Sequence, residues 1–249
     1  AGEDAWQGLL KRCQKDERCA REFPTLSSDL QQILKRLTGA PIMSLPKITN
    51  GASRLRVSAG LFAEAFRFSL YSPEASARVP TIIRNLLNGK VNMAEFALNV
   101  RNLPAGERLA AGFLLSVSCT EDIPYLPKKI GALAAGTFGG DYRLRQQIDA
   151  CTVWPRGEVS AQHRTPTKSA IPTLLLSGEF DPVTPPSGAE EVLNGLANGL
   201  HVVIRNNGHP MGSAEDCIGK MISEFIDRGS VTGLDISCAA TVAPVSFVY

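Results

Sequence analysis

Two apolar segments of the chain are each followed by a polar loop that carries a side chain capable of acid–base chemistry. Asp181 follows the apolar run 171–177, and His209 follows the apolar run 200–204. The spacing between these two residues leaves room for one helix and one strand. If the two runs are neighbouring parallel strands, both loops leave the same edge of the sheet and bring Asp181 and His209 together. A carboxylate that accepts the imidazole N–H fixes the tautomer of a histidine that acts as a base.

Each of these motifs also has an ordinary structural explanation when it is taken alone. A histidine that follows glycine in a loop is commonly a surface residue, and the segment 178–182, Gly-Glu-Phe-Asp-Pro, is typical of a turn. The joint pattern favours a catalytic pair, because two strands end in an Asp loop and a His loop at the spacing of one crossover. His163 in a polar loop and His201 within a strand are interpreted as structural.

A catalytic Asp–His pair needs a nucleophile, and the chain shows no recognisable serine for this role. In α/β-hydrolases the chain order is Ser, then Asp or Glu, then His, and the serine lies in a G-x-S-x-G elbow. No serine here has a glycine two residues away on both sides. Ser53, for example, has Gly51 two residues before it but Leu55 two residues after it. We therefore expect the chain to be the carboxyl-terminal part of a hydrolase whose nucleophile lies upstream of Ala1.

A carboxylate pair, Glu121 and Asp122, follows a third apolar run at residues 112–118. That run is predicted to be a fully buried strand, which would place both carboxylates near the mouth of the same site. Such a pair could bind the free α-ammonium group of a peptide. The alternative is a loop in which backbone N–H groups satisfy the carboxylates.

The six cysteines are even in number, and no two have C-x-x-C spacing. Three disulfides are therefore predicted, which implies an oxidising compartment. Sequence neighbours suggest the pairs Cys13–Cys19, Cys119–Cys151 and Cys217–Cys238, although spacing alone does not fix connectivity. Six free thiols in a cytoplasmic protein are one alternative, and Cys119 as a nucleophile is another. With three histidines and no C-x-x-C, no metal site is expected.

The remaining pattern predicts helices in front and alternating strands and helices behind. Apolar residues at helical spacing predict helices at residues 27–37, 58–71, 79–87, 93–100, 187–196 and 214–227. Together with the strands expected at 112–118, 171–177 and 200–204, this predicts an α/β layer of about three parallel strands with helices.

Composition excludes several classes of function. Lys and Arg number 26 and Asp and Glu 24, so the net charge of +2 gives no dense basic face for nucleic acid. No apolar run reaches the roughly 18 residues of a membrane-spanning helix. The chain begins at Ala1 without a signal peptide, so a processed or cut product is expected.

Several short motifs, taken in order, resemble one known family. They are Ser118-Cys-Thr-Glu-Asp-Ile-Pro124, Cys151-Thr-Val-Trp-Pro155, Leu174-Leu-Leu-Ser-Gly-Glu-Phe-Asp-Pro-Val-Thr-Pro-Pro186, Asn207-Gly-His209, Cys217, and Leu234-Asp-Ile-Ser-Cys238. In the front part they are Cys13 to Cys19, Phe23-Pro24 and Leu70-Tyr-Ser-Pro-Glu74. The sequence resembles the tripeptidyl-aminopeptidase-like (TAP-like) branch of the α/β-hydrolases, which is related to the proline iminopeptidases, from about residue 9 to 238.

The resemblance implies a Ser-His-Asp hydrolase with Asp181 as the acid and His209 as the base. It implies a helical cap at residues 1–112 and the carboxyl-terminal part of the hydrolase core at 113–249. It further implies an exported (secreted or periplasmic) aminopeptidase that acts on a peptide or small ester without metal or organic cofactor. The serine would come from the missing amino-terminal part of the same hydrolase, so the chain alone is expected to be inactive. An esterase of the same fold and a non-catalytic binding module are the alternatives.

Overall fold

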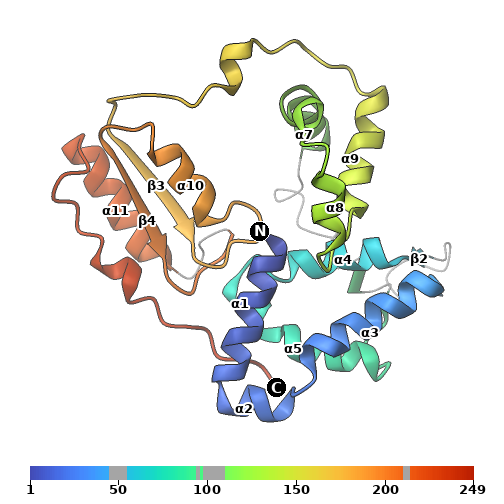
Figure 1. Ribbon diagram of the computed structural model, residues 1–249. Coiled ribbons are helices and arrows are strands. Elements are labelled where there is room, and N and C mark those ends of the chain that lie inside the picture. Colours follow the sequence, from blue (N-terminus) through green and yellow to red (C-terminus); the bar gives the residue numbers. More distant parts are fainter. Residues whose placement is uncertain (45–54, 94–95, 98–109, 210–213) are drawn as a thin grey trace. The chain divides into compact units, whose positions relative to one another are not determined.

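The computed structural model describes residues 1–44, 55–93, 96–97, 110–209 and 214–249 (Figure 1). Within them the chain forms two compact units, each assembled from separate stretches of sequence. Unit 1 comprises Ala1–Leu26, Ser69–Thr81 and Thr165–Tyr249, and unit 2 comprises Ser27–Phe68 and Ile82–Arg164. The division into a cap at 1–112 and a core at 113–249 concerns function and stays a prediction.

Unit 1 contains a parallel pair of strands joined by a helix. Strand β3 (Thr173–Gly178) pairs with β4 (Gly199–Ile204), and Leu174 lies opposite Leu200 in the register. Helix α10 (Pro186–Leu193) connects them and packs against both. The two strands and the helix predicted in this region are thus confirmed, with ends shifted by a few residues.

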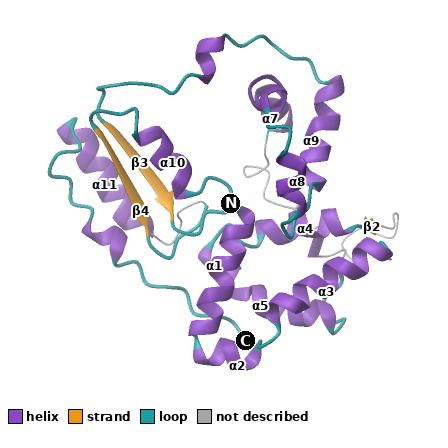
Figure 2. Ribbon diagram, in the orientation of Figure 1, coloured by secondary structure: helices purple, strands orange, loops and turns teal. Residues whose placement is uncertain are grey.

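Helix α11 (Glu215–Arg228) covers one face of this strand pair (Figure 2). Its Met221 is buried against Val202 and Ile204 of β4, with Leu174 and Leu176 of β3 packed around them. The short 3₁₀ turn η6 (Ser237–Ala240) adds Ala239 to this core and is tied to α11 by the Cys217–Cys238 disulfide.

The amino-terminal helices also belong to unit 1. Helix α1 (Gly2–Lys15) buries Trp6 and Leu9, and the Cys13–Cys19 disulfide joins it to α2 (Glu17–Glu22). The side chain of Asp16 caps α2 by accepting a hydrogen bond from the Cys19 N–H. Such an oxygen satisfies one of the donors that the first turn of a helix leaves unpaired.

Unit 2 is mainly helical. Its elements are α3 (Leu26–Gly39), which starts at the last residue of unit 1, β1 (Ile42–Ser44), β2 (Leu55–Val57), α4 (Ala59–Phe68), α7 (Ala111–Val117), the π turn η2 (Ser118–Asp122), η3 (Ile123–Tyr125), α8 (Ile130–Ala135), α9 (Tyr142–Val153) and η4 (Ala161–Arg164). Strands β1 and β2 pair antiparallel. The rings of Phe62 and Phe66 are buried, the first against Phe96 and the second edge-on to Phe138.

The prediction of a buried strand at residues 112–118 is wrong. This segment forms helix α7 and the start of η2, and Phe113 is 73% exposed. A short, wholly apolar run carries no periodicity that separates a strand from a helix. No other described segment pairs with it as a strand, and a helix satisfies its backbone groups internally. The expected three parallel strands are therefore two among the described residues.

The helix predicted at 79–87 begins earlier than expected. Helix α5 runs from Pro73 to Leu87, and its residues up to Thr81 belong to unit 1. Its N-cap is Ser72, whose hydroxyl accepts from the Ala75 N–H, while Pro80 lies inside the helix. A proline at the first helical position is the usual start signal, and here Pro73 holds that position.

The structure confirms two of the other helices predicted in the amino-terminal part of the chain. Those predicted at 27–37 and 58–71 are confirmed as α3 and α4, while the one predicted at 93–100 falls mostly outside the described residues. None of the described helices combines the length and the apolar composition of a membrane-spanning segment.

Candidate active site

Asp181 lies in the loop that follows β3, and its side chain is almost fully buried. Its Oδ1 accepts hydrogen bonds from the backbone N–H groups of Val183 at 2.7 Å and Thr184 at 2.8 Å. Its Oδ2 accepts from the Thr184 hydroxyl at 2.9 Å. A buried carboxylate is costly without partners, and these three donors satisfy its oxygens and hold it in one orientation.

His209 lies in the loop that follows β4, and its Nδ1 is 2.9 Å from Oδ2 of Asp181. Because an ionised carboxylate can only accept, we assign the proton of this hydrogen bond to Nδ1. In the neutral imidazole, Nε2 is then the nitrogen that can take a proton. The side chain of Asp181 is 3% exposed and that of His209 is 41% exposed, so the pair joins a buried anchor to an accessible base.

Two glycines allow the two loops to approach so closely. A Cβ at Gly178 would collide with the backbone oxygen of Gly208, and a Cβ at Gly208 would collide with the backbone oxygen of Tyr71. The backbone of Asn207 accepts from the Phe180 N–H at 2.8 Å, which fastens the His209 loop to the Asp181 loop.

Tyr71 forms the third side of the His209 environment. Its backbone oxygen accepts the His209 N–H, and its ring stands edge-on to the imidazole with 5.5 Å between ring centroids. These contacts fix both the backbone and the ring plane of His209. The arrangement is a positioned acid–base pair that can move a proton at Nε2.

Two residues of this site were not predicted from the sequence. Thr184 could have been found, because a hydroxyl three residues after an Asp in a Pro-rich loop commonly joins a local turn. Tyr71 could not, because nothing in its own neighbourhood indicates a contact with a loop so distant in sequence.

The other two histidines each have a side-chain hydrogen-bond partner. His201 lies in β4, and its Nε2 is 3.0 Å from the hydroxyl of the buried Ser177. His163 lies in η4, with its Nε2 3.0 Å from Oε2 of Glu121.

Glu121 and Asp122 do not follow a strand. They close the π turn η2 after helix α7, in unit 2, whereas Asp181 and His209 belong to unit 1. Glu121 has a side-chain partner in His163. Whether these carboxylates bind a peptide amino end stays a prediction.

All three expected disulfides are present, and the chain has no free cysteine. Cys119 is bonded to Cys151, so the alternative in which its thiolate is the nucleophile is wrong. Among the described residues, no group of three or more His, Cys, Asp or Glu side chains could hold a metal ion.

Comparison with known proteins supports the sequence resemblance over one part of the chain. Residues 136–238 match the family model described as TAP-like protein. No curated protein matches the chain. The matched segment contains β3, α10, β4, α11 and both members of the Asp181–His209 pair. The resemblance to this family is thus confirmed over residues 136–238, the carboxyl-terminal part of the chain that matches the TAP-like model.

Proposed function

We propose that this chain supplies the acid and the base of a serine hydrolase, with Asp181 as the acid and His209 as the base. The observation that carries the proposal is the 2.9 Å hydrogen bond from the exposed imidazole to a carboxylate that is itself buried and held by three other donors. A surface His–Asp contact has no need of such a rigid anchor.

In the proposed reaction, the serine of a G-x-S-x-G elbow attacks the carbonyl carbon of a peptide or ester. Nε2 of His209 takes the serine proton and later gives it to the leaving amine or alcohol. Asp181 stabilises the imidazolium while it exists. No G-x-S-x-G occurs in this sequence, so the proposal assigns the elbow to an amino-terminal part of the same hydrolase.

The strand pair of unit 1 supports the proposal of such an additional part. Parallel sheets are normally larger and covered on both faces. Among the described residues, β3 pairs as a strand with β4 alone, and Leu174, Leu175 and Leu176 stay only partly buried. The free edge of β3 is where a further strand of a hydrolase sheet would pair.

For the substrate, we propose an exported aminopeptidase that releases residues or short peptides from free amino termini. Its family resemblance supports peptide hydrolysis, and the three disulfides are typical of an oxidising compartment. Glu121 and Asp122 are the proposed partners of the substrate α-ammonium group. The two alternatives are an esterase of the same fold and an inactive binding module. The following experiment distinguishes both from the aminopeptidase.

The test uses the hydrolase completed by the coding region that precedes Ala1. Activity is measured on short peptide p-nitroanilides with free or blocked amino ends and on p-nitrophenyl esters. His209→Ala and Asp181→Asn should each lower kcat by about three to four orders of magnitude. Asp227→Asn, which changes an exposed carboxylate of α11, is the matched control and should leave kcat unchanged.

Each outcome decides between the readings. Preference for free amino ends, with a KM for these substrates that rises in Glu121→Gln, supports the aminopeptidase. Cleavage of esters alone supports the esterase. Hydrolysis that survives His209→Ala, or a completed protein that lacks hydrolysis altogether, contradicts the proposed role of the pair.

A further inference from the structure

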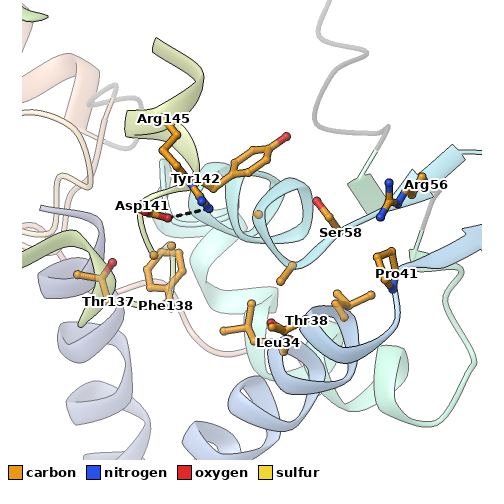
Figure 3. A pocket seen from close by; sticks show the side chains of 15 residues that line it. Leu34, Thr38, Pro41, Arg56, Ser58, Thr137, Phe138, Asp141, Tyr142 and Arg145 are labelled. Atoms are coloured by element: carbon orange, nitrogen blue, oxygen red, sulfur yellow. Dashed lines mark hydrogen bonds and ion pairs between the residues drawn. The ribbon is translucent and has the colours of Figure 1, made fainter. Parts of the chain in front are cut away.

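Unit 2 contains a cavity of about 670 Å³ that no part of the proposed mechanism uses. It lies among the carboxyl end of α3, the segment from Arg56 to Gly60, and the loop that leads into α9 (Figure 3). Its volume is within the range of sites that hold a small organic ligand, about 300–1,000 Å³.

The cavity combines an apolar lining with charged groups at its sides. Its apolar lining residues are Leu34, Leu37, Pro41, Ala59 and Phe138. Figure 3 shows Arg56 on one side and Arg145, with its partner Asp141, on the opposite side. A ligand that fits this cavity would pack an apolar part against the apolar lining and place a polar group beside one of the arginines.

Two of the hydroxyl groups around the cavity already donate hydrogen bonds within the protein. Thr38 donates to the backbone oxygen of Leu34, and Thr137 donates to that of Ala134. The hydroxyl oxygen of Ser58 accepts from the Leu61 N–H. The two threonine hydroxyls therefore contribute little further recognition, whereas the Ser58 hydroxyl, whose oxygen accepts in this bond, and the guanidinium groups can donate toward a ligand.

The charges that line the cavity favour a single anion. The charged groups in the lining are two guanidinium groups, of Arg56 and Arg145, and one carboxylate, that of Asp141. Arg145 is bound to Asp141 at 2.9 Å, whereas no ion pair joins Arg56 to another of the described residues. A guanidinium offers parallel N–H donors that match the two oxygens of a carboxylate.

We propose that this cavity binds a small amphipathic carboxylate, with the carboxylate at Arg56 and the apolar part on Leu34 and Phe138. The chemistry suits a short apolar peptide with a free carboxyl end as well as a medium-chain fatty acid. This binding proposal does not depend on the proposed hydrolase activity, because it is tested by ligand binding to the chain alone.

Isothermal titration of the chain at low ionic strength tests the proposal. The probes are N-acetyl-leucyl-leucine, its carboxyl-terminal amide, and decanoate. We expect at least one of the two acids to bind, and the amide to bind about tenfold more weakly than the peptide acid if the peptide is the ligand. Binding of decanoate alone would identify the fatty acid as the source.

Three variants separate recognition from loss of structure. Arg56→Gln should weaken binding of the acid about tenfold. Asp141→Asn should strengthen it, because it removes the opposing charge and releases Arg145. Arg143→Gln is the control. Arg143 lies on α9, the helix that carries Arg145, but it pairs with Glu64, and neither residue belongs to the cavity lining. Its loss should leave binding unchanged.

A cavity-filling variant adds a steric test. Thr38→Trp places an indole in the cavity and should abolish binding, while Arg56→Gln stays informative if the tryptophan variant does not fold. Failure of both acids to bind the unmodified chain would overturn the proposal. So would equal binding of the peptide acid and its amide, or equal weakening by Arg143→Gln and Arg56→Gln.

Discussion

The position of the His209 ring depends on a residue without a side chain. Gly208 lies against the backbone oxygen of Tyr71, the same oxygen that accepts the His209 N–H. A methyl group at 208 has no flexible neighbour to displace, because the atom it meets belongs to the backbone. The loop must then move, and His209 moves with it.

We expect Gly208→Ala to lower the free energy of unfolding by about 1–3 kcal/mol. Urea unfolding of the chain measures this change. The matched control is Gly219→Ala, since nothing lies within 4 Å of a Cβ at this position of α11. Alanine in a helix interior should stabilise the chain there by about 0.5–1 kcal/mol. Equal effects of the two substitutions would contradict the close approach at Gly208.

The central pair of the site was predictable from single residues and their spacing. Asp181 and His209 each follow an apolar run, and one crossover brings the ends of two parallel strands together. The support from Tyr71 was not predictable, because it depends on where a distant chain segment packs. The donors to Asp181 are local, so the contact with Thr184 is predictable from the Pro-rich loop itself.

At the scale of elements, the α1–α2 junction gives a pH-dependent contribution to stability. The pKa of Asp16 is lowered, first by the hydrogen bond from the Cys19 N–H and then by the one from the Tyr249 hydroxyl. A carboxyl group with a lowered folded-state pKa stabilises the fold above its unfolded pKa of about 3.9. This contribution is lost as the pH falls through the folded-state value.

We therefore expect Asp16→Asn to destabilise the chain at pH 6 and to have a smaller effect at pH 3. Asparagine also caps helices well, so the change mainly removes the charge. Urea unfolding at both pH values measures the difference. Tyr249→Phe removes one donor to Asp16 and should shrink the pH-dependent part. A difference between Asp16→Asn and the unmodified chain that is the same at pH 3 and pH 6 would contradict this account.

The elements were predictable where two independent signals agreed. The segments that form β3 and β4 are apolar runs bounded by turn residues and separated by a helical pattern, which together indicate a strand–helix–strand unit. The run at 112–118 had only its apolar character, and it folds as a helix beside the Cys119–Cys151 disulfide. Pro80 also suggested a helix start, but Ser72 followed by Pro73 is the stronger start signal, and the helix begins there.

At the scale of the whole molecule, the α/β character of the carboxyl-terminal part was predictable, but the composition of the two compact units was not. Helices α1 and α2 belong to the same unit as the β3–β4 pair, although most of the chain separates them in sequence. Helical periodicity shows that a helix has an apolar face and does not show which core buries it. That choice depends on long-range contacts.

The disulfides act within these units, and none connects one unit to the other. Cys119–Cys151 closes the longest loop, with a sequence separation of 32, followed by Cys217–Cys238 at 21 and Cys13–Cys19 at 6. A cross-link restricts the unfolded chain more as the loop lengthens, which gives about 3.7 kcal/mol for the longest loop and about 2.4 kcal/mol for the shortest.

We expect the double Cys→Ser variants to lose stability in that order, with the pair at 119 and 151 most affected. Thermal unfolding followed by circular dichroism measures the loss, and mass spectrometry after thiol labelling verifies that the other two bonds remain. The Cys13–Cys19 double variant is the internal control, because the same chemistry closes a much shorter loop. If that variant is the least stable, strain or packing at α1–α2 outweighs loop closure.

The same bonds test the inferred compartment. If all three disulfides form equally well when the chain is made under reducing conditions, the inference of an oxidising compartment loses its support.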